Sequence, residues 1–180
     1  IKCGHNLMAF NNYNLRMVSD ALDIAEDVTG NFYKFSLGQW KRHHYDVKTL
    51  SFLIENEISS HAFAILKKCT RVVDGFEPKT KNRDFYFICL QDNHILRALR
   101  RDSKLSLPSL LVYIFTHELV HIVRFCNFSQ RFDAPEKERE REEKIVHTKT
   151  FAILKDLSIP KLDYILDSYH GHRVCDMVVS

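Results

Sequence analysis

Residues 113 to 125 read YIFTHELVHIVRF, and inside this stretch lies an HExxH pattern formed by His117, Glu118 and His121. Positions four apart on an α-helix point the same way, so the two imidazoles can reach one metal ion. Glu118 falls beside them, within reach of a bound water but poorly placed to be a ligand itself. The neighbouring residues are apolar nearly all round, which predicts a central buried helix. The stretch therefore predicts a metal site at the centre of the fold.

The same pattern also arises by chance, in about one sequence of this length and composition in thirty. A satisfied pair of core side chains, or a degenerate site, is the alternative interpretation. The setting favours the metal site, because histidine and glutamate within a buried apolar helix are costly unless something satisfies them.

The composition is that of an ordinary soluble protein. The 180 residues are 45% hydrophobic and 27% charged, which predicts a single domain over 1–180 with its core at about 47–157. The net charge of +3 is too small, and the basic residues too scattered, for a nucleic-acid partner. No run of roughly 18 or more uncharged apolar residues indicates a membrane span.

The five cysteines contain no CxxC pair, which argues against a disulfide framework and against a cysteine zinc site. A cytoplasmic location is therefore expected. Composition predicts neither the oligomeric state nor the natural substrate. Because the chain opens at Ile1 rather than at a methionine, whether a leader precedes it stays open.

The first half of the chain reads as mainly helical. Leu15, Val18, Leu22 and Ala25 predict an amphipathic helix that Gly30 ends. A second, longer helix is predicted from an apolar spacing of three and four residues, which is carried by Val47, Leu50, Ile54, Ile58, Ala62, Ile65 and Cys69. The Gly, Pro and Lys content of 73–83 predicts a loop.

The second half adds one strand and more helices. Residues 84–91, DFYFICLQ, are apolar on both alternating faces and predict a strand buried on both sides. Asp92 is expected to cap the next helix, Pro108 to open the central one, and Asp133 with Glu136 to form a capping pair for the last. The class is α+β, predominantly helical, with a small sheet beside the central HExxH helix.

Residues 117 to 121 resemble the signature of the zincin metallopeptidases, and the order of elements over 84–157 is similar to theirs. Metzincins continue the motif as HExxHxxGxxH, but Arg124 and Asn127 occupy those two positions here. Gluzincins, the thermolysin-like branch, take a third zinc ligand from a glutamate on the following helix. The resemblance implies such a ligand within REEKIVHTKT, residues 141 to 150.

Helical phase favours Glu143 as that ligand. Glu143 lies about 30° from the centre of the apolar stripe of the last helix and Glu142 about 70°. Asp133, which follows His121 by 12 residues, is a further candidate from the loop side. In thermolysin-like sites an Asp follows the ligand by four residues. His147 stands there in this chain, and we expect it to hydrogen-bond to a ligand or to a reaction intermediate.

Several other residues are weaker candidates. The strand Phe85 to Leu90 is expected to be an edge strand that pairs with extended substrate, as the resemblance implies. His61 is predicted to be a core histidine, with a metal role as the alternative. The remaining candidates are Tyr164, Tyr169 and His170 as oxyanion donors, His170, His172 and Cys175 as a second metal site, Cys3 as an inhibitory thiol, and His43 and His44 as surface residues.

Taken together, the sequence predicts a zinc metallopeptidase. Zinc is bound by His117, His121 and Glu143, while Glu118 is the general base and His147 assists, and the substrate is a peptide or protein. A zincin-fold sensor or regulatory module that binds or cleaves a single partner is the first alternative. The second is a helical interaction protein in which the motif is accidental.

Overall fold

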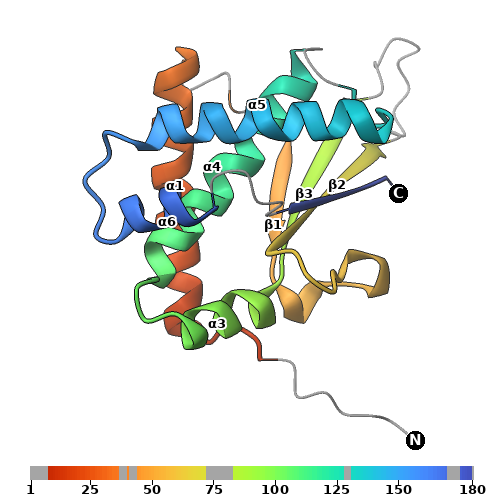
Figure 1. Cartoon of the computed structure of the whole chain (residues 1–180). Helices are drawn as coiled ribbons and strands as arrows, with labels where there is room; N and C mark the ends of the chain where they lie inside the picture. Colours follow the sequence, from red (N-terminus) through yellow and green to blue (C-terminus); the bar gives the residue numbers. More distant parts are fainter. Residues whose placement is uncertain are drawn as a thin grey trace, which may run out of the picture.

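The computed structural model describes residues 8–36, 40, 44–71, 83–127, 131–169 and 175–179. Helices pack beside a four-stranded sheet (Figure 1). The elements, in which η denotes a 3₁₀ helix, are α1 (Asn12–Tyr33), β1 (Tyr45–Lys48), η1 (Leu50–Phe52), η2 (Glu55–Glu57), β2 (Ala64–Arg71), β3 (Arg83–Leu90), α3 (Asp92–Arg101), α4 (Leu107–Cys126), α5 (Glu136–Leu154), α6 (Leu162–Tyr169) and β4 (Cys175–Val179). The prediction of a largely helical α+β protein with a small sheet is confirmed.

The strand predicted from residues 84–91 is present as β3, but it lies inside the sheet. The strand order is β1-β3-β2-β4, with β1 parallel to β3, β2 antiparallel to β3 and β4 parallel to β2. The prediction that Phe85 to Leu90 forms a substrate-binding edge is therefore wrong. Because β1 and β2 both pair with β3, its main-chain groups are already used on both sides.

The single long helix predicted over residues 47–69 is replaced by β1, the two 3₁₀ turns and β2. The apolar spacing was misleading because Ile54 and Ile58, which would lie on the buried stripe, are 55% and 43% exposed. Residues 62–66, AFAIL, are a short apolar run that is half-buried or fully buried throughout. Such runs occur equally in buried strands and buried helices, so periodicity alone could not distinguish them.

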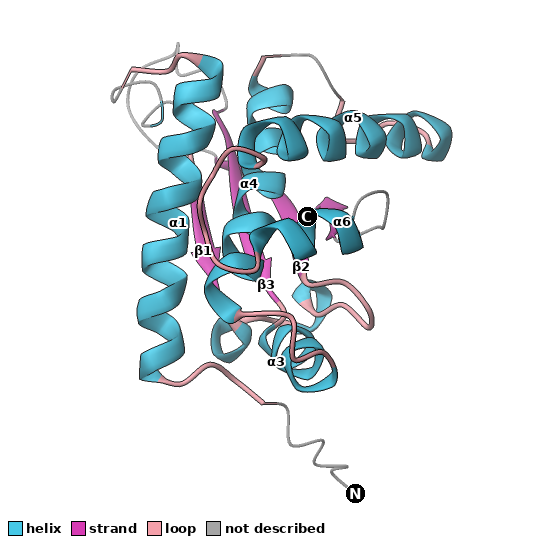
Figure 2. Cartoon of the chain, turned by 60° about the vertical axis from the view of Figure 1, so that its left-hand side comes forward, coloured by secondary structure: helices cyan, strands magenta, loops and turns pink. Residues whose placement is uncertain are grey.

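Helix α4 is the central element of the described structure. Almost all its side chains are buried, and α1 packs along it (Figures 1 and 2). Pro108 stands in its first turn as predicted. The helix is long and apolar enough to cross a membrane, but 89% of its most apolar window is buried inside the protein. Tyr86 of β3 stacks on Phe125 with ring centroids 5.8 Å apart, which joins the sheet to this helix.

Gly30 does not end α1, which continues to Tyr33 before Lys34 adopts a left-handed conformation with φ 57°. The glycine instead makes room for Trp40. A Cβ at position 30 would lie 2.8 Å from Trp40 Nε1, and that nitrogen donates a hydrogen bond of 3.2 Å to the carbonyl oxygen of Glu26. A close approach of a ring to the helix backbone is therefore the reason for glycine here.

The two predicted caps are also corrected. Asp92 is the first residue of α3 rather than its cap, and its buried carboxylate accepts hydrogen bonds from the backbone N–H of Phe10 and Leu50. Asp133 does not cap α5, because the N-cap is Pro135 and makes no side-chain bond. The core also extends beyond 47–157, because it includes these buried residues of α1 and α6: Val18, Ala21, Ala25, Leu162, Ile165 and Leu166.

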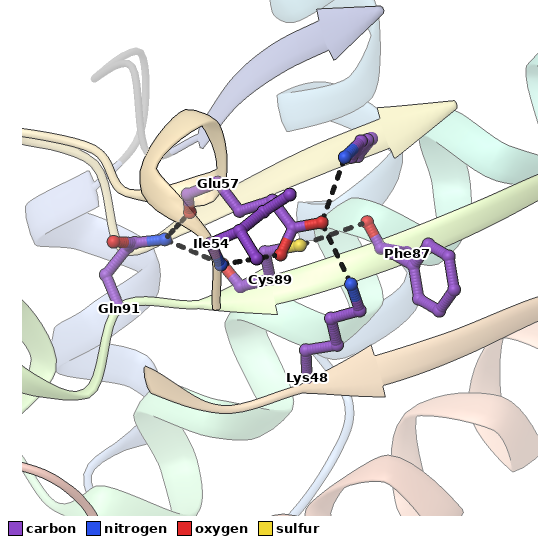
Figure 3. Close-up of polar contacts among 7 residues, drawn as sticks. Lys48, Ile54, Glu57, Phe87, Cys89 and Gln91 are labelled. Atoms are coloured by element: carbon purple, nitrogen blue, oxygen red, sulfur yellow. Dashed lines mark hydrogen bonds and ion pairs between the residues drawn. The ribbon is translucent and has the colours of Figure 1, made fainter. Parts of the chain in front are cut away.

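A buried cluster of charged side chains connects the segment between β1 and β2 to the sheet (Figure 3). The Glu57 carboxylate, 1% exposed, lies 2.9 Å from Lys48 Nζ and 3.0 Å from Lys67 Nζ. Its second oxygen accepts from the backbone N–H of Ile54, and Gln91 Nε2 donates to its backbone oxygen. Each buried polar group in this cluster thus has a partner, which offsets the loss of its hydration.

Candidate metal centre

Helix α4 carries the HExxH residues in its second half. His117, Glu118 and His121 are 0% exposed, and the two imidazole centroids lie 4.9 Å apart. The surrounding leucines, isoleucines and valines keep this part of the helix in the core. The sequence alone predicted this burial, because the apolar residues leave no polar face on α4.

Helix α5 brings a carboxylate against the two histidines. Glu143 Oε2 lies 3.4 Å from His117 Nε2, and Glu143 Oε1 lies 3.2 Å from His121 Nε2. The Glu143 side chain is only 16% exposed. The structure therefore places together the three residues that the sequence assigned as ligands.

The two other candidate carboxylates face different groups. Glu142 Oε2 accepts hydrogen bonds of 2.6 and 2.9 Å from the guanidinium of Arg124. Asp133 is 71% exposed and lies 3.4 Å from the Arg131 guanidinium. Neither contact brings a carboxylate to the histidines.

His147 also joins the cluster from α5. Its Nε2 lies 3.9 Å from Glu143 Oε2, and its ring lies 4.7 Å from that of His117. His117, Glu143 and His147 form a group whose potential ligand atoms all lie within 4.8 Å of one another. His147 is therefore a further potential ligand, in a group of three that does not include His121.

Tyr113 is a site residue that the sequence analysis did not identify. Its hydroxyl lies 3.0 Å from His147 Nδ1 and donates to the backbone oxygen of Tyr169 at 3.4 Å. The contact fixes the orientation of the His147 ring, whose Nε2 lies on the side of the cluster, 3.9 Å from Glu143 Oε2. The signal for Tyr113 was its position four residues before His117, on the same helix face.

The electrostatics suit a cation. Burial raises the pKa of the Glu143 carboxyl, but its contacts with His117 and His121 outweigh this effect, and the net pKa is lowered well below its usual range. Burial is the largest cause of the lowered pKa of His117, which keeps that imidazole neutral. An ionised carboxylate beside a neutral imidazole is the protonation state in which both bind metal.

The spacing of the potential ligand atoms is compatible with a metal ion. Tetrahedral zinc with bonds of about 2.0–2.2 Å separates neighbouring ligand atoms by about 3.3 Å. The two histidine–glutamate separations, 3.2 and 3.4 Å, agree with this value, whereas the His147 separation of 3.9 Å is longer. Among the described residues, neither ring nitrogen of His117 has a hydrogen-bond partner, nor does Oε2 of Glu143. Buried polar atoms without a partner call for an explanation, and a bound metal ion would supply one.

The other candidates lie elsewhere. His61 is exposed outside any helix, with its Nδ1 3.1 Å from Ser60 Oγ, so the prediction of a core histidine on a helix is wrong. The Tyr164 hydroxyl bonds to Asp102 rather than to the cluster. His44 precedes β1, and its carbonyl accepts from the Tyr86 N–H. Cys175 begins β4. Outside the described residues lie Cys3, His43, His170, His172 and most of the predicted loop 73–83.

Comparisons with protein-family models, with curated proteins and with solved structures found no match.

Proposed function

We propose that this protein is a zinc-dependent metallopeptidase of gluzincin type, in which His117, His121 and Glu143 hold the metal. The observation that carries the proposal is the convergence of these three side chains. Two of them come from one buried helix and the third from the next, with ligand-atom separations of 3.2 and 3.4 Å. The order of a small sheet, a central HExxH helix and a following helix that supplies the carboxylate also supports a zincin-like fold.

The protein groups would divide the chemistry between them. Zinc supplies a Lewis acid that lowers the pKa of water and polarises a peptide carbonyl. The Glu118 carboxylate takes the proton of the attacking water and delivers it to the leaving amide nitrogen. His147 is held by Tyr113 through Nδ1, and its Nε2 faces Glu143 at 3.9 Å, from where it would assist the reaction. His117, Glu118 and His121 are fully buried and Glu143 is 16% exposed, so contact of the group with bulk water is limited.

A second function is supported by the position of His147. If its Nε2 completes the ligand set, four protein groups close a tetrahedral site, and such sites are structural rather than catalytic. The protein would then be a metal-dependent sensor or binding module. The 3.9 Å separation, which is longer than the other two, favours the peptidase.

Two measurements test the proposal. Elemental analysis of the purified chain should find about one zinc per molecule. Denatured casein should be hydrolysed by the unsubstituted protein and not by Glu118→Gln, which should keep its zinc because Glu118 is not a ligand. Glu140→Gln, an exposed change on α5, is the matched control and should leave both readouts unchanged. A chain that takes up no metal when zinc is offered would exclude the proposal, and a zinc-bound chain without hydrolysis would favour the sensor.

A further inference from the structure

A pocket of about 460 Å³ lies between α3, the segment that leads into β2, and the end of α6. Phe63 and Tyr169 form an aromatic wall in it, with their rings edge to face and their centroids 5.6 Å apart. Side chains of α3 form a second wall (α3 and α6 are labelled in Figure 1). His117, His121, Glu143 and His147 do not line this pocket, so it is separate from the cluster.

The wall contributed by α3 is basic. Arg97 and Arg101 are four residues apart and His94 is three before Arg97, so all three lie on one helix face and line the pocket. Neither arginine has an ion pair or hydrogen bond with any described residue. Two like charges at this spacing repel each other, and a bound anion would relieve that repulsion.

The carboxylate that lines the pocket, Asp102, forms no ion pair with Arg97 or Arg101, and neutral donors occupy its two oxygens. Asp102 Oδ2 accepts a hydrogen bond of 2.5 Å from the Tyr164 hydroxyl, and Oδ1 accepts one of 2.9 Å from the Lys104 N–H. The Nε2 atom of His94 already has a hydrogen-bond partner. It lies 2.9 Å from the Ser59 carbonyl oxygen and must donate to it. The guanidinium groups of Arg97 and Arg101 are therefore available as donors to a ligand.

The pocket is joined to the zinc-binding cluster through two tyrosines. Tyr169, which forms its aromatic wall, accepts a hydrogen bond at its backbone oxygen from the hydroxyl of Tyr113. The same hydroxyl contacts His147 Nδ1 at 3.0 Å. One hydroxyl, that of Tyr113, therefore contacts both the cluster and a residue of the pocket wall.

We infer that the pocket is a subsite for a carboxylate of the peptide substrate, an inference that rests on the proposed peptidase function. A guanidinium fork matches a carboxylate with two parallel hydrogen bonds, and the aromatic wall suits the aliphatic part of a side chain. The carboxylate comes either from an acidic side chain or from the C-terminus of the peptide. Arg97 and Arg101 bind it in both cases.

Fluorescein-labelled octapeptides of alanine and serine test this assignment. One glutamate is moved along the peptide, glutamine replaces it in each matched control, and every peptide is made with a free and with an amidated C-terminus. Binding is measured by fluorescence anisotropy on the Glu118→Gln full chain, so that turnover does not consume the probe. Cleavage of the same peptides by the unsubstituted chain is measured separately.

We expect one position of glutamate, or the free C-terminus, to bind about tenfold more tightly than its neutral control, as for one charge-assisted hydrogen bond. Arg97→Gln and Arg101→Gln should each remove this preference. Arg100→Gln, a change to an exposed arginine of the same helix outside the pocket, should keep it. The glutamate scan and the amidated series show which carboxylate is bound.

The outcomes separate this inference from the proposed function. Cleavage without any preference for a carboxylate, or no binding of any peptide, overturns the subsite. A preference that depends on Arg97 and Arg101 in a chain that cleaves nothing supports the subsite and counts against the peptidase. A preference unchanged in both arginine variants overturns the assignment of the pocket.

Discussion

Glu142 and Glu143 are adjacent on α5, yet their carboxylates contact different groups. Glu143 lies between the two histidines of α4, at 3.4 and 3.2 Å, while Glu142 forms a short ion pair of 2.6 Å with Arg124. The phase of the helix separates the two side chains by about 100°. The ion pair between Arg124 and Glu142 therefore joins this turn of α5 to α4, while the Glu143 side chain is directed to the cluster.

This relationship predicts opposite results from two adjacent substitutions. Glu143→Ala should weaken zinc binding by more than about 100-fold, because even changes outside the ligand set cost 10–100-fold. Glu142→Ala should keep the metal with at most a modest loss of stability. Zinc affinity measured by competition with a chelator checks both, with Asp133→Ala as the exposed control. If Glu142→Ala or Asp133→Ala were the variant that loses zinc, the ligand assignment would be wrong.

His117 and His121 were predicted from their spacing on one helix. A glutamate ligand on the following helix was implied by the resemblance to gluzincins, and helical phase then favoured Glu143 over Glu142. Tyr113 was missed because its contact with His147 depends on how α4 crosses α5, and no spacing within one helix determines that crossing. The arginine partner of Glu142 depends on the same crossing and was equally unpredictable.

His147 decides between the two proposed functions. If it acts on the substrate, His147→Gln should keep about one zinc per chain and lower hydrolysis by about 100-fold or more, the range of general acid–base effects. If it is a ligand, the same variant should lose metal. Tyr113→Phe removes the hydroxyl that holds Nδ1 and should lower hydrolysis less, because the ring and its packing remain. Metal content and casein hydrolysis, measured on both variants, distinguish the two cases.

The strands were harder to predict than the helices that carry the cluster. β3 was predicted because it is aromatic and apolar on both faces, whereas β1 has only four residues and β2 begins in an apolar run that fits a helix equally well. What fixes this region is long-range: Glu57 binds Lys48 from one strand and Lys67 from another. Ion pairs between residues on different elements leave no periodic signal in the sequence.

Glu57 should make stability depend on pH. Burial raises the pKa of its carboxyl, but hydrogen bonds from Lys48, Lys67 and the Ile54 N–H outweigh burial, and the folded pKa lies below its ordinary value of 4.5. A carboxyl with a lowered pKa stabilises the fold above that ordinary value, and the contribution disappears as the pH falls through the lowered folded pKa.

The difference in unfolding free energy between the unsubstituted chain and Glu57→Gln should therefore be about 3 kcal/mol at pH 7, as for a broken buried ion pair. It should shrink steadily below pH 4.5. Urea unfolding at a series of pH values measures it. Glu55→Gln, a change at an exposed residue of the same turn, should show no such dependence. A difference that stays constant down to the acid transition would contradict the assigned role.

At Gly30 the helical preference for alanine competes with the close contact of Trp40. Replacing glycine by alanine inside a helix ordinarily stabilises it by about 0.5–1 kcal/mol. Here the new Cβ would lie 2.8 Å from Trp40 Nε1, so the indole must move and weaken its hydrogen bond to Glu26. Overpacking of this kind costs about 1–3 kcal/mol, which exceeds the helical gain. Gly30→Ala should therefore destabilise the protein.

A second background separates the two effects. Phenylalanine lacks the indole nitrogen, so in a Trp40→Phe chain the close contact is absent and only the helical preference remains. Gly30→Ala should then stabilise the protein by about 0.5–1 kcal/mol. The sign of the change should thus reverse between the two backgrounds in a double-mutant cycle measured by urea unfolding. If Gly30→Ala stabilised the unsubstituted chain, the contact with Trp40 would not be what requires glycine at position 30. If alanine destabilised both chains equally, the constraint at position 30 would come from something other than the indole nitrogen of Trp40.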